Sequence, residues 1–309
     1  MSLPPELLDY VCGFVATRDL ALVARCSITL YPIALRSLYR QITISDASTQ
    51  SIVHTLAHRR DIAAFVRKFS VADVSLCPHE LAAALTNMAA TLVSLDIWVE
   101  GVESWIFSTG LMSPQLEHLG TSIPFDPHVA GFCAGAPSLE TVHFASEPVD
   151  FCVDACVFPR LATFTGSAKA AVAIVPGRPI ESVFITSGDL SEDLVPVLAR
   201  STSQLSVLST TTNSLPVSLL GGLGRHLPQL RYLQINSTRD LATPPTTIFY
   251  EQVADALALF PILESFELSG IYWPSQVYQQ EQKRVWQSQP LHAEELDAPE
   301  DMDEFGFLW

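Results

Sequence analysis

Residues 227–236 read LPQLRYLQIN, and this stretch decides the fold because its pattern recurs along the chain. Leu230 is followed by two further apolar residues, Leu233 and Ile235, with polar residues between them. This alternation is typical of a short strand with one buried face, since successive side chains on a strand point to opposite sides. Pro228 cannot continue a helix and favours extended backbone before it, so it marks the passage from a helix into the strand.

The same pattern, apolar-x-x-apolar-x-(apolar or small), begins at nine places. Its leading residues are Val66, Leu92, Leu116, Leu139, Leu161, Ile180, Leu205, Leu230 and Leu263. The intervals between them are 26, 24, 23, 22, 19, 25, 25 and 33 residues. Most of these intervals fit a structural repeat of roughly 20–29 residues. Proline stands two residues before the leading residue in SPQL (113–116), APSL (136–139), FPRL (158–161), LPQL (227–230) and FPIL (260–263).

Stretches with helical character lie between these strands. They are HELAAALTNMAA (79–90), VESWIFSTGL (102–111), SEDLVPVLAR (191–200), SLLGGLGRHL (218–227) and YEQVADALALF (250–260). A unit of strand, turn, helix and turn cannot bury its apolar face alone, but stacked copies share one continuous core. We expect that core to contain the inward pairs Leu95 and Ile97, Val142 and Phe144, Val183 and Ile185, Leu233 and Ile235, and Phe266 and Leu268.

Residues 46–271 resemble the leucine-rich repeats of ubiquitin-ligase receptors. The resemblance implies an α/β fold, namely a leucine-rich-repeat solenoid with a sheet of parallel strands and outer helices. The simpler alternative is an ordinary α/β domain with leucine-rich strands. The pattern is lost over residues 272–309, where we expect a C-terminal cap and an acidic tail.

Residues 1–45 have a different organisation, with three short helices predicted. Pro4 and Pro5 suit a helix start, because their missing N–H groups would be unpaired there in any case. A second helix follows a break near Thr17, and a third covers roughly residues 30–39. Three short helices make only a small core, which usually needs a partner surface or a neighbouring domain. This size is a physical reason to expect a protein interface.

The order of residues in this N-terminal stretch resembles an F-box. The opening of that family is matched by Leu3, Pro4, Glu6, Leu7, Leu8 and Val11. Its centre, an Asp-Leu that begins a helix and is followed by a small residue and Ser, is matched by Asp19, Leu20, Leu22, Cys26 and Ser27. Its end is matched by Ala34, Leu35, Leu38, Tyr39 and Arg40. The chain departs from the family at residues 28–30, where Ile-Thr-Leu replaces basic and aromatic residues.

The resemblance implies docking onto the Skp-type adaptor of a cullin–RING ubiquitin ligase. The partner-binding residues would be Leu3, Pro4, Glu6, Leu7, Leu8, Val11, Phe14, Leu20, Leu22 and Val23. The chain would then be a non-enzymatic, cofactor-free subunit whose repeats bind a protein substrate. The alternatives are a generic helical cap over the first repeat, a repeat scaffold without a ligase, and a hydrolase or metal enzyme with a cryptic site.

Alternation along the strands also predicts which side chains face the concave surface, where a substrate would bind. This rule selects Trp98, His118, His143, Phe184, Tyr232, Gln234, Asn236 and Glu267. Aromatic side chains on such a surface are good binding anchors. Asp96 and Glu267 suggest that a partner could be partly basic.

Composition limits the remaining function classes. The formal net charge of −16 speaks against nucleic-acid binding, which requires a positive surface. No secretory signal and no membrane span are expected, and six cysteines without a CxxC predict buried free thiols in the cytoplasm, the nucleus or both.

Two pairs of residues have the spacing of metal ligands on a helix. His54 and His58 could share a helix face, as could Cys152 and Cys156, but no further ligand accompanies either pair. Surface or packing roles are therefore expected for both pairs. The acidic, aromatic residues 293–309 are either a solvated tail or a segment that docks on the last repeat.

Overall fold

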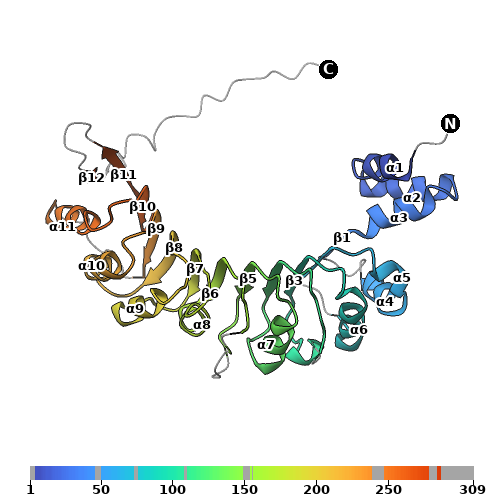
Figure 1. Cartoon of the computed structure of the whole chain (residues 1–309), viewed down its shortest axis with the longest axis horizontal. Helices are drawn as coiled ribbons and strands as arrows, with labels where there is room; N and C mark the ends of the chain where they lie inside the picture. The colour runs from blue at the N-terminus through green and yellow to red at the C-terminus, as the bar shows by residue number, and fades with distance from the viewer. Residues whose placement is uncertain are drawn as a thin grey trace, which may run out of the picture.

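In the computed structural model the chain forms an α/β arc, with a sheet along the concave side and helices along the convex side (Figure 1). The structure describes residues 4–45, 50–72, 76–107, 110–148, 154, 156–238, 247–277 and 284–286. This arrangement is compatible with a repeat solenoid, in which each unit contacts only its neighbours.

The strands follow one another across the sheet in chain order. They are β1 (Gln41–Ile44), β2 (Lys68–Ala72), β3 (Ser94–Trp98), β4 (His118–Thr121), β5 (Thr141–Phe144), β6 (Thr163–Ser167), β7 (Ser182–Ser187), β8 (Val207–Thr212), β9 (Tyr232–Ser237), β10 (Ser265–Leu268), β11 (Ile271–Val277) and β12 (Arg284–Trp286). Strands β1 to β10 form a series in which each pairs in parallel with the next. The last two pair antiparallel, β11 with β10 and β12 with β11, which ends the parallel series.

Three helices precede the first strand, and the others connect the strands and cover the convex side. They are α1 (Pro5–Cys12), α2 (Thr17–Cys26), α3 (Tyr31–Tyr39), α4 (Gln50–His58), α5 (Arg60–Ala63), α6 (Pro78–Met88), α7 (Pro127–Ala134), α8 (Ala168–Ile174), α9 (Val195–Leu198), α10 (Pro216–His226) and α11 (Thr247–Leu257), with 3-10 turns η2 (Ser104–Ile106) and η3 (Glu192–Leu194). The helix predicted over residues 102–111 is wrong in extent, because the structure forms only η2 within its described part. No helix of the described residues is both long enough and apolar enough to cross a membrane.

A repeated backbone contact sets each strand on the one before it. The carbonyl of the residue just before a strand accepts N–H bonds from two consecutive residues of the next repeat, as Arg67 and Lys68 donate to Arg40 at 2.9 and 3.1 Å. Along the described chain nine carbonyls do this, all at 2.8–3.1 Å: those of Arg40, Arg67, Val93, Glu117, Glu140, Ala162, Glu181, Ser206 and Arg231. Every strand from β2 to β10 therefore starts at the same height.

The apolar core confirms the repeating pattern. All nine leading residues of the sequence repeat are buried, and so are the members of all five inward pairs. Eight of the nine leading residues directly precede a residue of the carbonyl series. The ninth, Leu263, directly precedes Glu264, whose N–H donates to the carbonyl of Arg231. The same pattern therefore places one leucine-type side chain under each strand of the shared core.

The first strand was not anticipated. Strand β1 pairs in parallel with β2 inside the range assigned to the helical module, and Ile42 and Ile44 are buried beneath it. Tyr39, at the position where other repeats have a buried leucine-type residue, is only half-buried. The sheet therefore begins where the third helix ends.

The three N-terminal helices have a small core of their own, built from Cys12, Leu20, Ile33 and Ala34. This core is separate from the core of the repeats. Helix α3 joins the two, since Leu38 packs on the first core while Leu35 and Tyr39 pack against the second. In Figure 1 the three helices stand at the N-terminal end of the arc, beyond β1.

The described cysteines are all free, but only Cys12 and Cys133 are buried. Burial raises the pKa of the Cys133 thiol, which makes it unreactive. The expectation of buried thiols is wrong for Cys26, Cys77 and Cys156, which are exposed. Cys152 lies outside the described residues.

A buried arginine holds the irregular connection between β5 and β6. Arg178 is 3% exposed, and its guanidinium donates to the carbonyls of Val157 at 2.8 Å, Asp154 at 2.8 Å and Ile174 at 2.6 Å. It also lies over the ring of Phe158, 5.8 Å from the centroid. Phe158 has a φ of 67°, a left-handed conformation that a bulky residue adopts only when its surroundings enforce it.

We predict that Arg178→Met lowers the free energy of unfolding by roughly 2–4 kcal/mol, because it leaves buried carbonyls without donors. Arg160→Met is the matched control, since Arg160 is exposed and close in sequence. Urea denaturation of both variants measures the difference. Equal stabilities would contradict the role given to Arg178.

Candidate protein-interaction sites

The first candidate site is an exposed apolar face on the N-terminal helices. Half of the large apolar side chains that the described structure leaves exposed lie between residues 7 and 31. They are Leu7, Tyr10, Val11, Phe14, Leu22, Ile28 and Tyr31, which we call the N-terminal apolar face. Phe14 is 75% exposed and Ile28 is 91% exposed. So many exposed large apolar side chains on three short helices make this module a candidate interaction site.

Helix α1 sets the geometry of this face. Leu7 and Val11 are four residues apart and lie on one side of the helix. Tyr10 and Phe14 pack edge to face, with ring centroids 4.9 Å apart. Two aromatic rings held against each other lose little conformational freedom when a partner covers them, which makes them suitable anchors.

The structure divides the residues proposed to bind the adaptor into two groups. Pro4, Glu6, Leu7, Val11, Phe14 and Leu22 are exposed. Leu20 is buried in the module core, and Leu8 and Val23 pack against that core. These last three residues support the N-terminal apolar face from behind, and Leu3 lies outside the described residues. The adaptor-binding residues predicted from the sequence do not include Tyr10, Ile28 and Tyr31, which the structure also leaves exposed.

The second candidate site lies on the concave strands. All eight residues predicted to face this surface are at least partly exposed and flank buried positions. Trp98, His118 and His143 come together on β3, β4 and β5, whereas four others lie on β9 and β10. Because neighbouring strands are about 4.8 Å apart, roughly 19 Å separates β5 from β9. Phe184 on β7 lies between the two groups.

The group on β3 to β5 is a connected cluster. His118 Nε2 donates to Asp96 Oδ1 over 3.0 Å, and the Trp98 and His143 rings are 4.7 Å apart between centroids. All four side chains are partly exposed. We call these four residues the concave cluster. The hydrogen-bond partner of the His118 ring among the described residues is the Asp96 carboxylate, and Ser94 and Thr141 are its neighbours on the adjoining strands.

Gly120 makes the concave cluster possible. It occupies the position on β4 between Asp96 of β3 and His143 of β5. A Cβ atom at this position would lie 2.8 Å from Cζ2 of Trp98 and would also collide with the Asp96 carboxylate. The side chains of β3 therefore lean across the glycine to reach His118 and His143. Sequence reasoning missed this residue, because the sequence does not show which side chains of neighbouring strands lie over a glycine.

The group on β9 and β10 is more polar. Ser209 Oγ donates to Gln234 Oε1 over 2.8 Å, and Gln234 is paired with Glu267 across the strands. Tyr232 Oη donates to Glu264 Oε2 over 3.0 Å, and this hydrogen bond raises the pKa of Tyr232. These residues offer hydrogen-bonding groups, whereas the concave cluster offers rings.

The candidate metal ligands have other contacts. His54 Nδ1 lies 2.8 Å from Glu80 Oε1, and His58 Nδ1 lies 2.8 Å from the carbonyl of His54. No group of three or more His, Cys, Asp or Glu residues in the described chain is arranged to hold a metal ion.

Comparison with known proteins finds no matching family model and no matching curated protein. The candidate sites therefore stand on their own geometry.

Replacing Gly120 tests the packing of the concave cluster. We predict that Gly120→Ala destabilises the protein by roughly 1–3 kcal/mol, because the added methyl group forces Trp98 or Asp96 to move. Gly131→Ala is the control, because a Cβ atom on this helical glycine would meet nothing within 4 Å. That control should be neutral or slightly stabilising. A neutral Gly120→Ala in urea denaturation would show that the leaning arrangement is wrong.

His143 predicts a pH dependence. Burial lowers its pKa, and the neighbouring His118 lowers it further, while Asp96 acts in the opposite direction. The unfolded chain therefore binds a proton on His143 at a higher pH than the folded chain does. Stability should fall as pH decreases through about 6.5, the ordinary histidine value, and His143→Gln should show a shallower fall. Urea denaturation at each pH from 7.5 to 5.5 measures the free energy of unfolding of both proteins. The same pH dependence in both would contradict the buried surroundings given to His143.

Proposed function

We propose that this protein is a substrate-recruiting subunit of a Skp-cullin-F-box ubiquitin ligase. In this proposal residues 1–45 are an F-box that docks on the Skp-type adaptor, and the arc is a leucine-rich-repeat solenoid that binds a protein substrate. The protein acts by bringing two others together and carries out no chemistry itself. Cytoplasm and nucleus, where such ligases work, are the expected compartments.

The N-terminal apolar face carries the proposal. A three-helix module of this size has little core, yet it leaves Leu7, Tyr10, Val11 and Phe14 exposed together. Covering these side chains with a partner would remove apolar surface from water. The F-box-like order of residues in the same helices suggests which partner this is.

The sheet supports the second half of the proposal. Its concave side presents two separate groups of half-exposed side chains on a rigid frame, as a surface for a protein segment would require. Asp96 lies among aromatic rings in the concave cluster, and such a combination suits a lysine or arginine side chain of the substrate.

Binding to the Skp-type adaptor tests the proposal. We predict that Phe14→Asp weakens binding by at least roughly tenfold, the effect of removing one anchor residue. The same change at Leu7 should act in the same direction. Both residues are exposed, so the variants should keep the circular dichroism spectrum and melting temperature of the wild type. Isothermal titration calorimetry with the purified adaptor measures the affinities.

The matched control is Ile248→Asp. Ile248 is 64% exposed near the start of α11, where an acidic residue is tolerated, and it lies far from the N-terminal helices. It should bind the adaptor as the wild type does. If the wild-type protein does not bind the adaptor at all, the proposal fails, and a repeat scaffold without a ligase becomes the better interpretation.

A further inference from the structure

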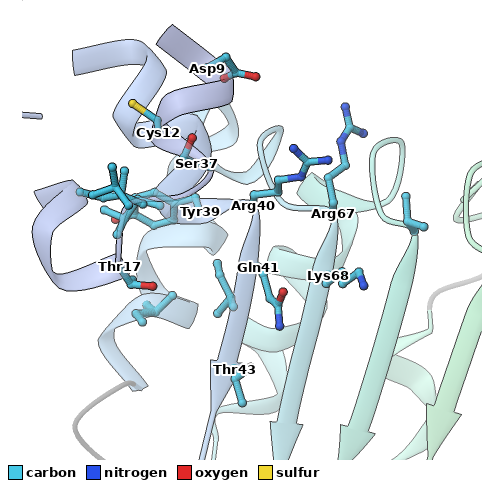
Figure 2. Close-up of a pocket in the computed structure, with 17 residues that line it drawn as sticks. Asp9, Cys12, Thr17, Ser37, Tyr39, Arg40, Gln41, Thr43, Arg67 and Lys68 are labelled. Atoms are coloured by element: carbon cyan, nitrogen blue, oxygen red, sulfur yellow. The ribbon is translucent and has the colours of Figure 1, made fainter. Parts of the chain in front are cut away.

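Three arginines meet in a hollow at the joint between the helical module and the sheet. The hollow has a volume of ≈430 Å³, and Arg36, Arg40 and Arg67 line it together with Asp9 and Ser37. It adjoins a larger hollow of ≈1120 Å³ (Figure 2). This gathering of positive charge is unexpected in a chain with a net charge of −16.

The fold brings the three arginines together. Arg36 and Arg40 are four residues apart at the end of α3, so they lie on the same side of the helix. The backbone N–H of Arg67 donates to the carbonyl of Arg40 over 2.9 Å, which places the two residues at neighbouring positions of the sheet. Figure 2 shows the side chains of Arg40 and Arg67 next to each other at the starts of neighbouring strands.

Local acceptors neutralise these arginines only in part. Arg67 donates to the carbonyl of Thr91 over 2.7 Å and to Gln115 Oε1 over 3.2 Å, and Arg36 lies 3.8 Å from Asp9. For Arg40, no acceptor within hydrogen-bonding or ion-pairing distance is found among the described residues. The lining therefore holds three arginines and one carboxylate, an excess of two positive charges that a bound anion would offset.

We propose that this hollow binds a phosphoryl group in its dianionic form. Guanidinium groups bind phosphate oxygens through paired hydrogen bonds, and the Ser37 hydroxyl can donate a further one. A dianion matches the excess of two positive charges better than a carboxylate does. The bound group would also tie Arg40 of the helical module to Arg67 of the sheet, and so would stiffen the joint.

This inference goes beyond the adaptor role and does not rest on it. None of the residues that line the hollow belongs to the N-terminal apolar face. A phosphoryl group can come from a phosphorylated side chain or from a free phosphate, and the two sources share the same chemistry at the hollow.

Calorimetry with the full-length protein tests the proposal. The probes are inorganic phosphate and the capped tripeptide Ala-phosphoserine-Ala, with its unphosphorylated form as the negative probe, at pH 7.5 and constant ionic strength. We expect phosphate and phosphopeptide to bind at one site and the unphosphorylated peptide not to bind. Tighter binding of the phosphopeptide indicates a phosphorylated protein segment as the source, and equal binding indicates a free phosphate.

Charge variants identify the site. Arg40→Gln should weaken phosphate binding roughly tenfold or more, since it removes a charge-assisted donor. Asp9→Asn should strengthen binding, because it removes the opposing carboxylate, and a gain of this kind cannot arise from unfolding. Arg160→Gln, at an exposed arginine outside the hollow, should change nothing. Phosphate binding that is absent, is matched by chloride, or is unchanged in both Arg40→Gln and Asp9→Asn would overturn the proposal.

Discussion

One backbone contact fixes the rest of this structure: a carbonyl just before each strand accepts two N–H groups from the following repeat. Because the contact recurs from Arg40 to Arg231, each strand starts at the same height as its neighbour, and the same sequence positions face the core throughout. The concave positions are set by the same register. So is the meeting of Arg40 and Arg67, which are the first two members of the series.

Much of this arrangement could be predicted from the sequence, because burial on one face of a strand leaves a period-two pattern. The leading residues from Val66 to Leu263 gave the strands β2 to β10 in order. Strand β1 was missed because Tyr39 replaces the leading leucine and remains half-buried. The direction of side chains on short helices was also harder to predict, since Leu20 fits the F-box pattern but points into the module core.

Side-chain contacts across strands could not be predicted, because they depend on the strand register and on whether the residue between them has a side chain. Trp98 and His143 were each expected on the concave side, but the contact between their rings requires the bare backbone of Gly120 between them. The arginine hollow is similar, since Arg36 and Arg67 are far apart in sequence and meet only through the docking of α3 on the sheet. The two candidate interaction surfaces therefore differ: the N-terminal helices expose apolar side chains, whereas the sheet exposes rings and polar groups.

We propose that the N-terminal apolar face, and not the sheet, binds the Skp-type adaptor. Hydrogen–deuterium exchange of the full-length protein, with and without that adaptor, tests it most directly. We predict that adding the adaptor slows exchange within helices α1 to α3 and leaves the exchange rates of the strands from β3 to β10 unchanged. Protection on the concave strands instead, or no protection anywhere, would contradict it.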